Sequence, residues 1–216
     1  MADSPRDPPI VDPPIRLAVC VSGGGTTLQN LIDLTRTRRL KANVVQVVAS
    51  RPRIGAIPKA EAAGIPLALA SRTAKNRSDF SASVFHPIRQ RGADLVILGG
   101  FLALLDIPPD YQGRVLNIHP SLIPAFCGKG FHGQAVHQAV LDMGVKVTGC
   151  TVHLVDEGVD TGPIVRQAVV PVLDNDTVET LSARILEEEH RIYSEAICLF
   201  LENKVRVEGR RVVSNT

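Results

Sequence analysis

Cysteine is sparse in this chain, and the few cysteines are widely separated. Cys20, Cys127, Cys150 and Cys198 form no CxxC pair. That spacing argues against a disulfide framework and against a zinc finger, and it suits a reducing compartment. We therefore expect a cytoplasmic protein.

The sequence also lacks long apolar runs, a signal peptide and an excess of one charge. No apolar stretch approaches the ~20 residues that span a bilayer. The N-terminus, MADSPRDPPIVDPPI, has acids and prolines where a signal peptide has a basic start and an apolar core. A net charge of +2, with both signs spread along the chain, gives no bulk attraction to nucleic acid. We expect neither a membrane nor a nucleic-acid partner, and we interpret residues 1–14 as a flexible, Pro-rich tail.

What the sequence does contain is enough apolar material for one sizeable core. The chain has 216 residues, of which 44% are hydrophobic. Short β-branched runs alternate with amphipathic stretches, which is typical of βαβ units. We predict an α/β fold, an open, mostly parallel twisted sheet with helices on both faces. Because no repeat or interior linker is visible, residues 15–216 are expected to form a single domain.

The predicted elements follow this alternation along the whole chain. Strands are expected at 15–21, 43–50, 65–70, 94–100, 114–120, 146–156 and 163–172, and a terminal hairpin at 205–215. Helices are expected at 26–38, 56–64, 77–92, 130–144 and 176–201. Pro87 should kink or interrupt the third helix. Asp176 with Glu179 three residues later is a signal for the start of the last helix.

A glycine-rich turn, VSGGGTTL, follows the first predicted strand and opens a helix. Successive glycines let the backbone approach a ligand closely, and free amides at a helix start favour an anion. The stretch matches neither GxGxxG nor GxxxxGK[ST], so a single phosphate monoester fits it better than a dinucleotide or a nucleoside triphosphate. The alternative is a tight turn in which Thr26 caps the helix.

Two polar residues stand at the end of the apolar strand VLNIHP. Asn117 and His119 are two positions apart, so both side chains leave by the same face, at the strand end that borders the ligand crevice in open α/β sheets. An amide can stabilise an oxyanion and an imidazole can exchange a proton near pH 7. The acid that orients the histidine would come from Asp156, Glu157 or Asp160, among which the pattern does not choose. A hydrogen-bonded core histidine is the alternative.

Metal binding is a weaker hypothesis for the same residues, because the histidines show no HExxH or comparable ligand spacing. A third candidate site is Glu189, which falls in the apolar stripe of the last helix, whereas Glu187 faces outward. An inward carboxylate is costly unless it is paired, so Glu189 could hold a ligand hydroxyl or amine. Alternatively, it lies at the edge of the stripe and reaches water or an arginine.

Four segments together resemble the folate-dependent phosphoribosylglycinamide formyltransferases. They are SGGGTTL, NIHPSLIPAF, GVKVTGCTVHLVDEGVDTGPIV and EEEHRIY, and the resemblance extends from about Ile15 to Val207. It implies a formyltransferase fold with a Rossmann-like N-terminal half. It also implies formyl transfer from 10-formyltetrahydrofolate to glycinamide ribonucleotide in purine biosynthesis, without a metal. The expected partners are small-molecule substrates, and the expected state is a monomer or weak homodimer.

The resemblance also implies roles for individual residues. The catalytic set would be Asn117, His119 and Asp160, with Asp160 raising the pKa of His119. The ribonucleotide would be bound by Gly25, Thr26, Thr27 and Glu189. The folate would be bound by Arg77, Leu102, Ala103, Leu104, Leu105, Asn117, Val155 and Asp156.

The sequence departs from the family pattern at four places in this site, two of which are Gly24 and Thr27, where relatives often have Asn. Many relatives carry a basic residue where this chain has Ala103, which leaves more of the contact with the anionic folate tail to Arg77. The segment CGKGFHG (127–133) replaces a commoner proline-glycine form, and Lys129 could supply a replacement charge.

Three other functions are compatible with parts of the pattern. A formyltetrahydrofolate deformylase usually has an additional N-terminal domain and a residue other than Pro120 after the histidine. A methionyl-tRNA formyltransferase would need a C-terminal RNA-binding domain. A non-catalytic nucleotide-binding module would need only the glycine turn, and the Asn117–His119–Asp160 set argues against it.

Overall fold

The structure is a computed structural model that describes residues 14–70, 73–201 and 205–214. The tail predicted for residues 1–14 therefore lies outside the described residues, apart from Pro14. No helix of the described ranges is both long enough and apolar enough to cross a membrane.

Hydrogen bonds join the described strands into one sheet, in the order β3-β2-β1-β4-β5-β6-β7-β9-β8. The first five strands of this order, from β3 to β5, run parallel to one another. Strand β6 is antiparallel to both of its neighbours, β5 and β7. The strands are β1 (Ile15–Val21), β2 (Ala42–Ala49), β3 (Leu67–Leu69), β4 (Leu95–Leu98), β5 (Val115–His119), β6 (Val147–Leu154), β7 (Ile164–Pro171), β8 (Val205–Glu208) and β9 (Arg211–Ser214). The mostly parallel α/β sheet is confirmed, and its continuity is our reason to propose a single domain over 15–216.

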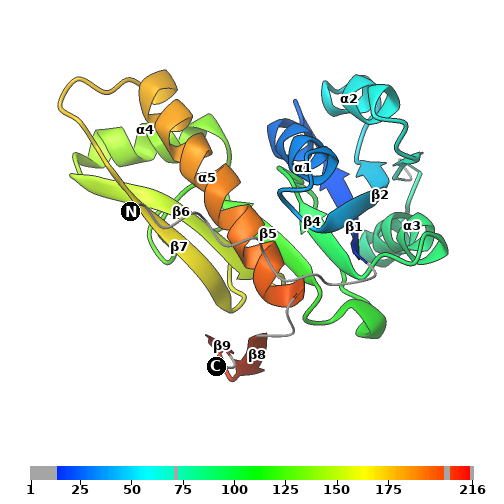
Figure 1. Ribbon diagram of the computed structural model, residues 1–216. Coiled ribbons are helices and arrows are strands. Elements are labelled where there is room, and N and C mark those ends of the chain that lie inside the picture. The colour runs from blue at the N-terminus through cyan, green and yellow to red at the C-terminus, as the bar shows by residue number, and fades with distance from the viewer. Residues whose placement is uncertain (1–13, 71–72, 202–204, 215–216) are drawn as a thin grey trace, which may run out of the picture.

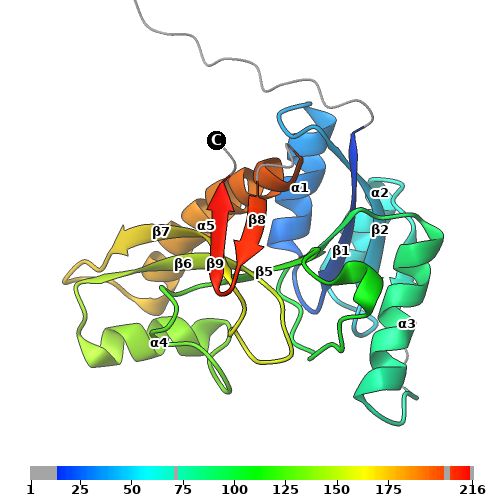
Figure 2. The ribbon, with the colours of Figure 1, turned by 90° about the horizontal axis from the view of Figure 1, so that it is seen from below.

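Helices cover both halves of this sheet. Figure 1 shows α5 lying across the antiparallel strands β6 and β7, while α1, α2 and α3 surround the parallel strands. The view from below in Figure 2 places α3 and α5 on opposite sides of the molecule. The helices are α1 (Thr26–Arg36), α2 (Ala56–Ala62), α3 (Arg77–Gln90), α4 (Gln134–Met143) and α5 (Val178–Leu201), with a short 3₁₀ turn η1 (Pro109–Tyr111).

The alternation of side chains along the central strand divides the interior into two cores. In β1, Leu17 and Val19 pack into the core that contains the buried face of α5, whereas Ala18 and Cys20 pack into the core under α3. A parallel strand covered on both faces needs apolar residues at every position, which is why this segment reads as one continuous apolar run.

One helix expectation is partly wrong. The helix α3 runs through Pro87 without interruption, although proline removes a backbone donor. Val84, Phe85 and Ile88, on both sides of the proline, are buried in the core under α3, and this packing stabilises the helix across it.

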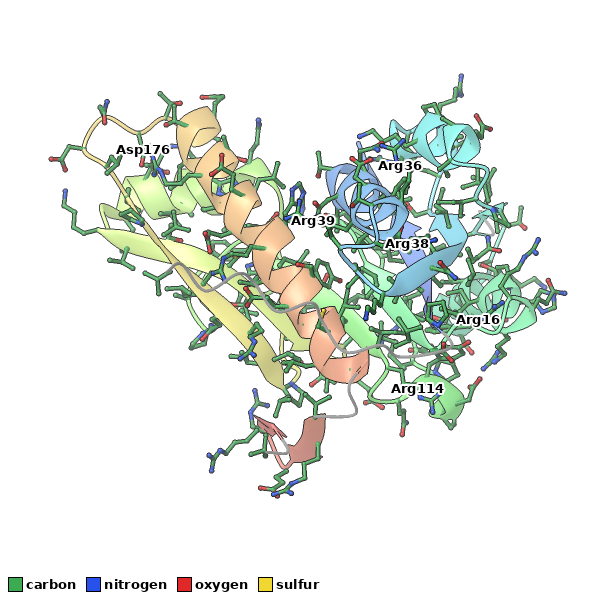
Figure 3. All side chains as sticks on the ribbon, viewed as in Figure 1. Arg16, Arg36, Arg38, Arg39, Arg114 and Asp176 are labelled. Carbon is green, nitrogen blue, oxygen red and sulfur yellow. The ribbon has the colours of Figure 1, made fainter. Side chains whose placement is uncertain are left out.

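The start of α5 also differs in detail from the expectation. The backbone N–H groups of Thr177 and Thr180 each bond the other residue's hydroxyl, at 2.9 and 3.3 Å, so this pair makes the reciprocal cap. Asp176 instead accepts two hydrogen bonds from Arg184, at 2.7 and 2.8 Å, and one from the N–H of Leu173. Figure 3 shows Asp176 at the turn that leads into α5.

Candidate active site

A cavity of about 570 Å³ opens where β1, β4 and β5 end, as expected for a crevice at the carboxyl ends of parallel strands. It is lined by nearly all the residues that the sequence predicted for a site. These are Gly25, Thr26, Thr27, Leu102, Ala103, Leu104, Leu105, Asn117, His119, Val155, Asp156, Asp160 and Glu189. Arg77 is the predicted site residue that does not line the cavity.

The glycine turn forms part of the cavity wall. Gly25 has φ +72°, and a Cβ there would lie 2.7 Å from the Cβ of Ala56, so only glycine fits. Gly25, not Thr26, is the N-cap of α1, and no side chain caps this helix. The first-turn amides are therefore directed toward the cavity without a side-chain acceptor, which is the arrangement that binds an anion. Thr26 and Thr27 add hydroxyl groups to the cavity lining.

Asn117 and His119 reach the middle of the cavity from the end of β5. The N–H at Nε2 of His119 donates to the carbonyl of Phe126 at 2.9 Å, so its Nδ1 faces the cavity side. The Asn117 amide donates to Nε2 of His153 at 3.1 Å, and Nδ1 of His153 donates to its neighbour's carbonyl, that of Leu154, at 2.8 Å. His153 therefore fixes the orientation of the Asn117 amide.

Asp160 lies between the two histidines. Its carboxylate oxygens are 3.5 Å from Nδ1 of His119 and 3.6 Å from Nε2 of His153. The N–H of Gly128 donates to the same carboxylate at 3.0 Å. Asp160 itself has φ +56°, a left-handed conformation that aspartate tolerates better than most residues.

The surrounding loop explains why Asp160, and not a neighbouring acid, faces the histidines. Asp156 is engaged within the loop, where it accepts hydrogen bonds from Thr161 at 2.5 Å and from the N–H of Gly158 at 3.1 Å. A Cβ at Gly162 would collide with the carbonyl oxygen of Leu154, at 1.8 Å, so glycine there permits the tight return of the loop. The geometry thus selects one acid among the three left open by the sequence.

Burial and neighbouring groups together set the pKa values of His119 and Asp160. Burial lowers the pKa of His119, and the bond to Phe126 and the charge of Asp160 raise it by less, so the pKa lies below its ordinary value. Asp160 acts on His119 in the predicted direction, but desolvation outweighs it. Burial raises the pKa of Asp160, yet His153, Gly128 and His119 together bring it below its ordinary value, so the carboxylate is ionised at pH 7.

Glu189 enters the cavity from the buried side of α5, one turn before the buried Tyr193. Desolvation raises the pKa of its carboxyl to about 7. The described residues give it no ion pair, so the expectation of an arginine partner at the edge of the stripe is not met. A carboxyl held near its titration point in a cavity is a candidate ligand-binding group.

The segment 102–105 forms an apolar part of the cavity wall. Leu102 and Leu104 are 61% and 48% exposed, an unusual exposure for leucine that provides an apolar wall, whereas Leu105 is buried. The segment is anchored at both ends by serine hydroxyls. Leu102 donates to Ser22 at 3.1 Å, and Asp106 donates to Ser81 at 2.8 Å.

Arg77 stands behind this wall instead of in the cavity. Its Nη2 donates to the carbonyl of Leu105 at 2.6 Å and to that of Glu157 at 3.5 Å. Its Nε is 2.6 Å from a carboxylate oxygen of Asp106. The two groups form an ion pair, but the Nε–H is not directed at that oxygen as a hydrogen bond requires. The guanidinium therefore connects the two loops that border this part of the cavity.

Sequence reasoning missed three histidines that line the cavity, His132, His137 and His153, which it considered only in judging metal binding. His153 is the register partner of Asn117 in the antiparallel pair β5–β6, a relation that requires knowing which strands pair. His137 lies on the buried side of α4 with Val136 and Val140 and lines the cavity. Its position on an apolar helix face was a signal available in the sequence. Among the described residues, no group of three or more His, Cys, Asp or Glu side chains is placed to hold a metal ion.

Comparison with known proteins identifies relatives over most of the chain. Residues 15–197 match the formyl transferase family. The phosphoribosylglycinamide formyltransferase of Bacillus subtilis is 35% identical over 185 residues, covering 84% of this chain and 92% of that protein. The crystal structure of glycinamide ribonucleotide transformylase 1 from Symbiobacterium toebii has a TM-score of 0.85 at 44% identity and covers 94% of each chain.

Some relatives are much longer proteins. The bovine trifunctional purine biosynthetic protein adenosine-3 is 43% identical over 195 residues, which is 89% of this chain but 19% of that protein. The chain thus spans about a fifth of the length of the first curated relatives it matches.

Proposed function

Because this chain belongs to the formyl transferase family, among the phosphoribosylglycinamide formyltransferases, we propose that it transfers a formyl group from 10-formyltetrahydrofolate to the amine of glycinamide ribonucleotide. The products are formylglycinamide ribonucleotide and tetrahydrofolate, so the enzyme acts in purine biosynthesis. The observation that carries the proposal is the placement of Asn117, His119 and Asp160 together in one cavity, which the uncapped glycine turn and an apolar wall also line.

The reaction requires stabilisation of the oxyanion that forms when the amine attacks the formyl carbon. Asn117 has one amide N–H bonded to His153, which leaves its second N–H for the oxyanion. Preorganised donors of this kind need no rearrangement during the reaction. Holding the two substrates side by side in the cavity supplies much of the remaining acceleration.

His119 is the proton donor to the departing folate nitrogen in this proposal. Since its Nε2–H is bonded to Phe126, the transferable proton is carried by Nδ1, the nitrogen that faces Asp160. The ionised Asp160 stabilises the protonated imidazole against the burial that lowers its pKa. Asp160 therefore compensates for desolvation instead of creating an unusually basic histidine.

Different parts of the cavity wall bind the two substrates. The glycine turn with Thr26 and Thr27 takes the ribonucleotide phosphate, and Glu189 takes a hydroxyl or the amine of that substrate. Leu102 to Leu105, with Val155 and Asp156, form the pocket for the folate ring. We assign Arg77 to holding that pocket in shape, in place of the expected contact with the folate tail, because its Nη2 donates to the carbonyls of both loops and its charge is paired with Asp106.

The cysteines bear on the location of the protein. None of the four, all of which lie within the described residues, forms a disulfide, which supports a cytoplasmic enzyme. We propose a monomer or weak homodimer, without a metal ion and with small molecules as its partners.

The proposal is tested by incubating the purified protein with 10-formyltetrahydrofolate, with and without glycinamide ribonucleotide. We expect tetrahydrofolate to form only when the ribonucleotide is present. Formate release without it would identify a deformylase, and ligand binding without turnover would identify a non-catalytic module.

A further inference from the structure

One buried histidine in the cavity wall has no part in the chemistry above. His137 lies in the first turns of α4 and lines the cavity, yet it is only 5% exposed. Its Nδ1 is buried without a hydrogen-bond partner among the described residues. Because an unsatisfied buried polar atom destabilises a protein, the stability of the empty enzyme does not explain a histidine at this position.

The two ring nitrogens have different surroundings. Nδ1 is fully buried and has no hydrogen-bond partner, whereas Nε2 is not among such atoms. Since the side chain lines the cavity, Nε2 is the nitrogen that is open to it. Burial, and then the proximity of His119, lowers the pKa of His137, so the ring is neutral at pH 7. A neutral imidazole has one N–H, and buried N–H groups without acceptors are rarer than unsatisfied acceptors. The proton therefore belongs on Nε2, where it gives the cavity a neutral donor.

The position of α4 indicates which substrate meets this donor. The helix packs against α5, whose residues Ser182 and Glu189 line the same cavity. Figure 1 shows α4 beside the first turns of α5. His137 thus shares its side of the cavity with the helix that carries Glu189, which we assigned to the ribonucleotide.

We propose that His137 binds the ribonucleotide, with Nε2–H donating to an uncharged oxygen, either a ribose hydroxyl or the glycinamide carbonyl. The inference rests on the proposed function, which defines that substrate. The glycine turn already supplies uncapped amides for the phosphate, whereas a neutral donor suits an uncharged acceptor. The bound substrate gives Nε2–H an acceptor, whereas the buried Nδ1 stays unpaired in both states.

The test is His137→Leu, which keeps an apolar side chain of similar size and removes both nitrogens. Calorimetric titration with glycinamide ribonucleotide should show about tenfold weaker binding, as expected for one lost hydrogen bond. Folate affinity should not change. The folding midpoint of the ligand-free variant should equal or exceed that of the parent, because an unsatisfied buried atom is removed. Gln138→Ala, on the exposed side of α4, is the matched control and should bind both ligands normally.

Two substrate analogues locate the contact. The phosphate-free glycinamide riboside should show the same tenfold penalty, and a penalty that disappears with the riboside would mean a phosphate contact and overturn the proposal. For a deoxyribose analogue, loss of the penalty assigns the bond to a ribose hydroxyl, and its retention assigns it to the glycinamide carbonyl.

The outcomes separate this proposal from the proposed function. If the parent binds the ribonucleotide but forms no formylated product, the proposed function fails while the binding comparison remains valid. If the parent forms the product but His137→Leu binds the ribonucleotide as tightly as the parent, only the proposed role of His137 is overturned. A lower folding midpoint with equal loss of both affinities would show a structural role, and would also overturn it.

Discussion

The glycine turn and the group around Asp160 are built in different ways. The glycine turn is local, because Gly23 to Thr27 follow one strand, open one helix and present backbone amides. The Asp160 group is assembled from β5, β6 and two loops, and each member depends on a distant partner. We expect the backbone site to tolerate the loss of its hydroxyl groups, although not a substitution of Gly25, whereas the assembled side-chain site should lose function when one member changes.

The largest predicted effect is therefore at Asp160. In Asp160→Asn the amide still accepts from Gly128 but no longer stabilises a protonated His119, so single-turnover formyl transfer should fall ~10²–10⁴-fold. Both substrates should still bind, as calorimetry would show. Glu157→Gln, a neighbouring exposed acid, is the control and should transfer at the parent rate. A near-normal rate in Asp160→Asn would remove this residue from the catalytic set.

Side-chain substitutions in the glycine turn should have a smaller effect than the substitution of Asp160. The double variant Thr26→Ala/Thr27→Ala removes two hydroxyl groups and keeps the backbone amides, so we expect ~10-fold weaker ribonucleotide binding with unchanged folate affinity. Thr37→Ala, at the other end of the same helix, should leave both affinities unchanged. Unaltered ribonucleotide affinity in the double variant would contradict the assignment of this turn to the phosphate.

Glu189 should make ribonucleotide binding depend on pH. Its pKa is raised to about 7 by desolvation, so the ionised form that accepts hydrogen bonds disappears as the pH falls from 8 to 6. Ribonucleotide affinity should therefore weaken over this range in the parent and remain flat in Glu189→Gln. Glu187→Gln, on the exposed face of the helix, should keep the pH dependence of the parent. The same dependence in Glu189→Gln would assign it to another group.

The raised pKa of Glu189 also makes the stability of the ligand-free protein depend on pH. This dependence runs in the opposite direction to that of ribonucleotide affinity. The folded state holds the Glu189 proton more tightly than the unfolded chain. The contribution of this proton to stability is therefore fully present below the ordinary glutamate pKa of 4.5 and is lost as the pH rises to about 7. The free energy of unfolding of Glu189→Gln should lack this decline.

The smallest predicted effect is at Arg77. If it supports the folate pocket from behind, Arg77→Ala should weaken folate binding only a few-fold, and equally for cofactors with one or several glutamates. Arg89→Ala, which breaks an ion pair with Asp110 at the other end of α3, is the control. A penalty that grows with the number of tail carboxylates would instead restore the direct contact expected from the sequence.

The difference between a local site and a site assembled from distant segments also explains what could be predicted from the sequence. The strands, the glycine turn and the Asn117–His119 pair were visible because each depends on short-range periodicity and spacing. The roles of His153 and Phe126 were not, since they depend on which strands pair and on how a loop folds over His119. The pKa of His119 was predicted from one charge, while the structure adds the larger effect of burial.

The central claim is that this cavity moves a formyl group between two bound substrates. The most direct measurement uses 10-formyltetrahydrofolate with carbon-13 in the formyl group, followed by NMR in the presence of glycinamide ribonucleotide. The account predicts that the label appears as the formamide carbon of formylglycinamide ribonucleotide. Label that appears as free formate, or that stays on the folate, would contradict it.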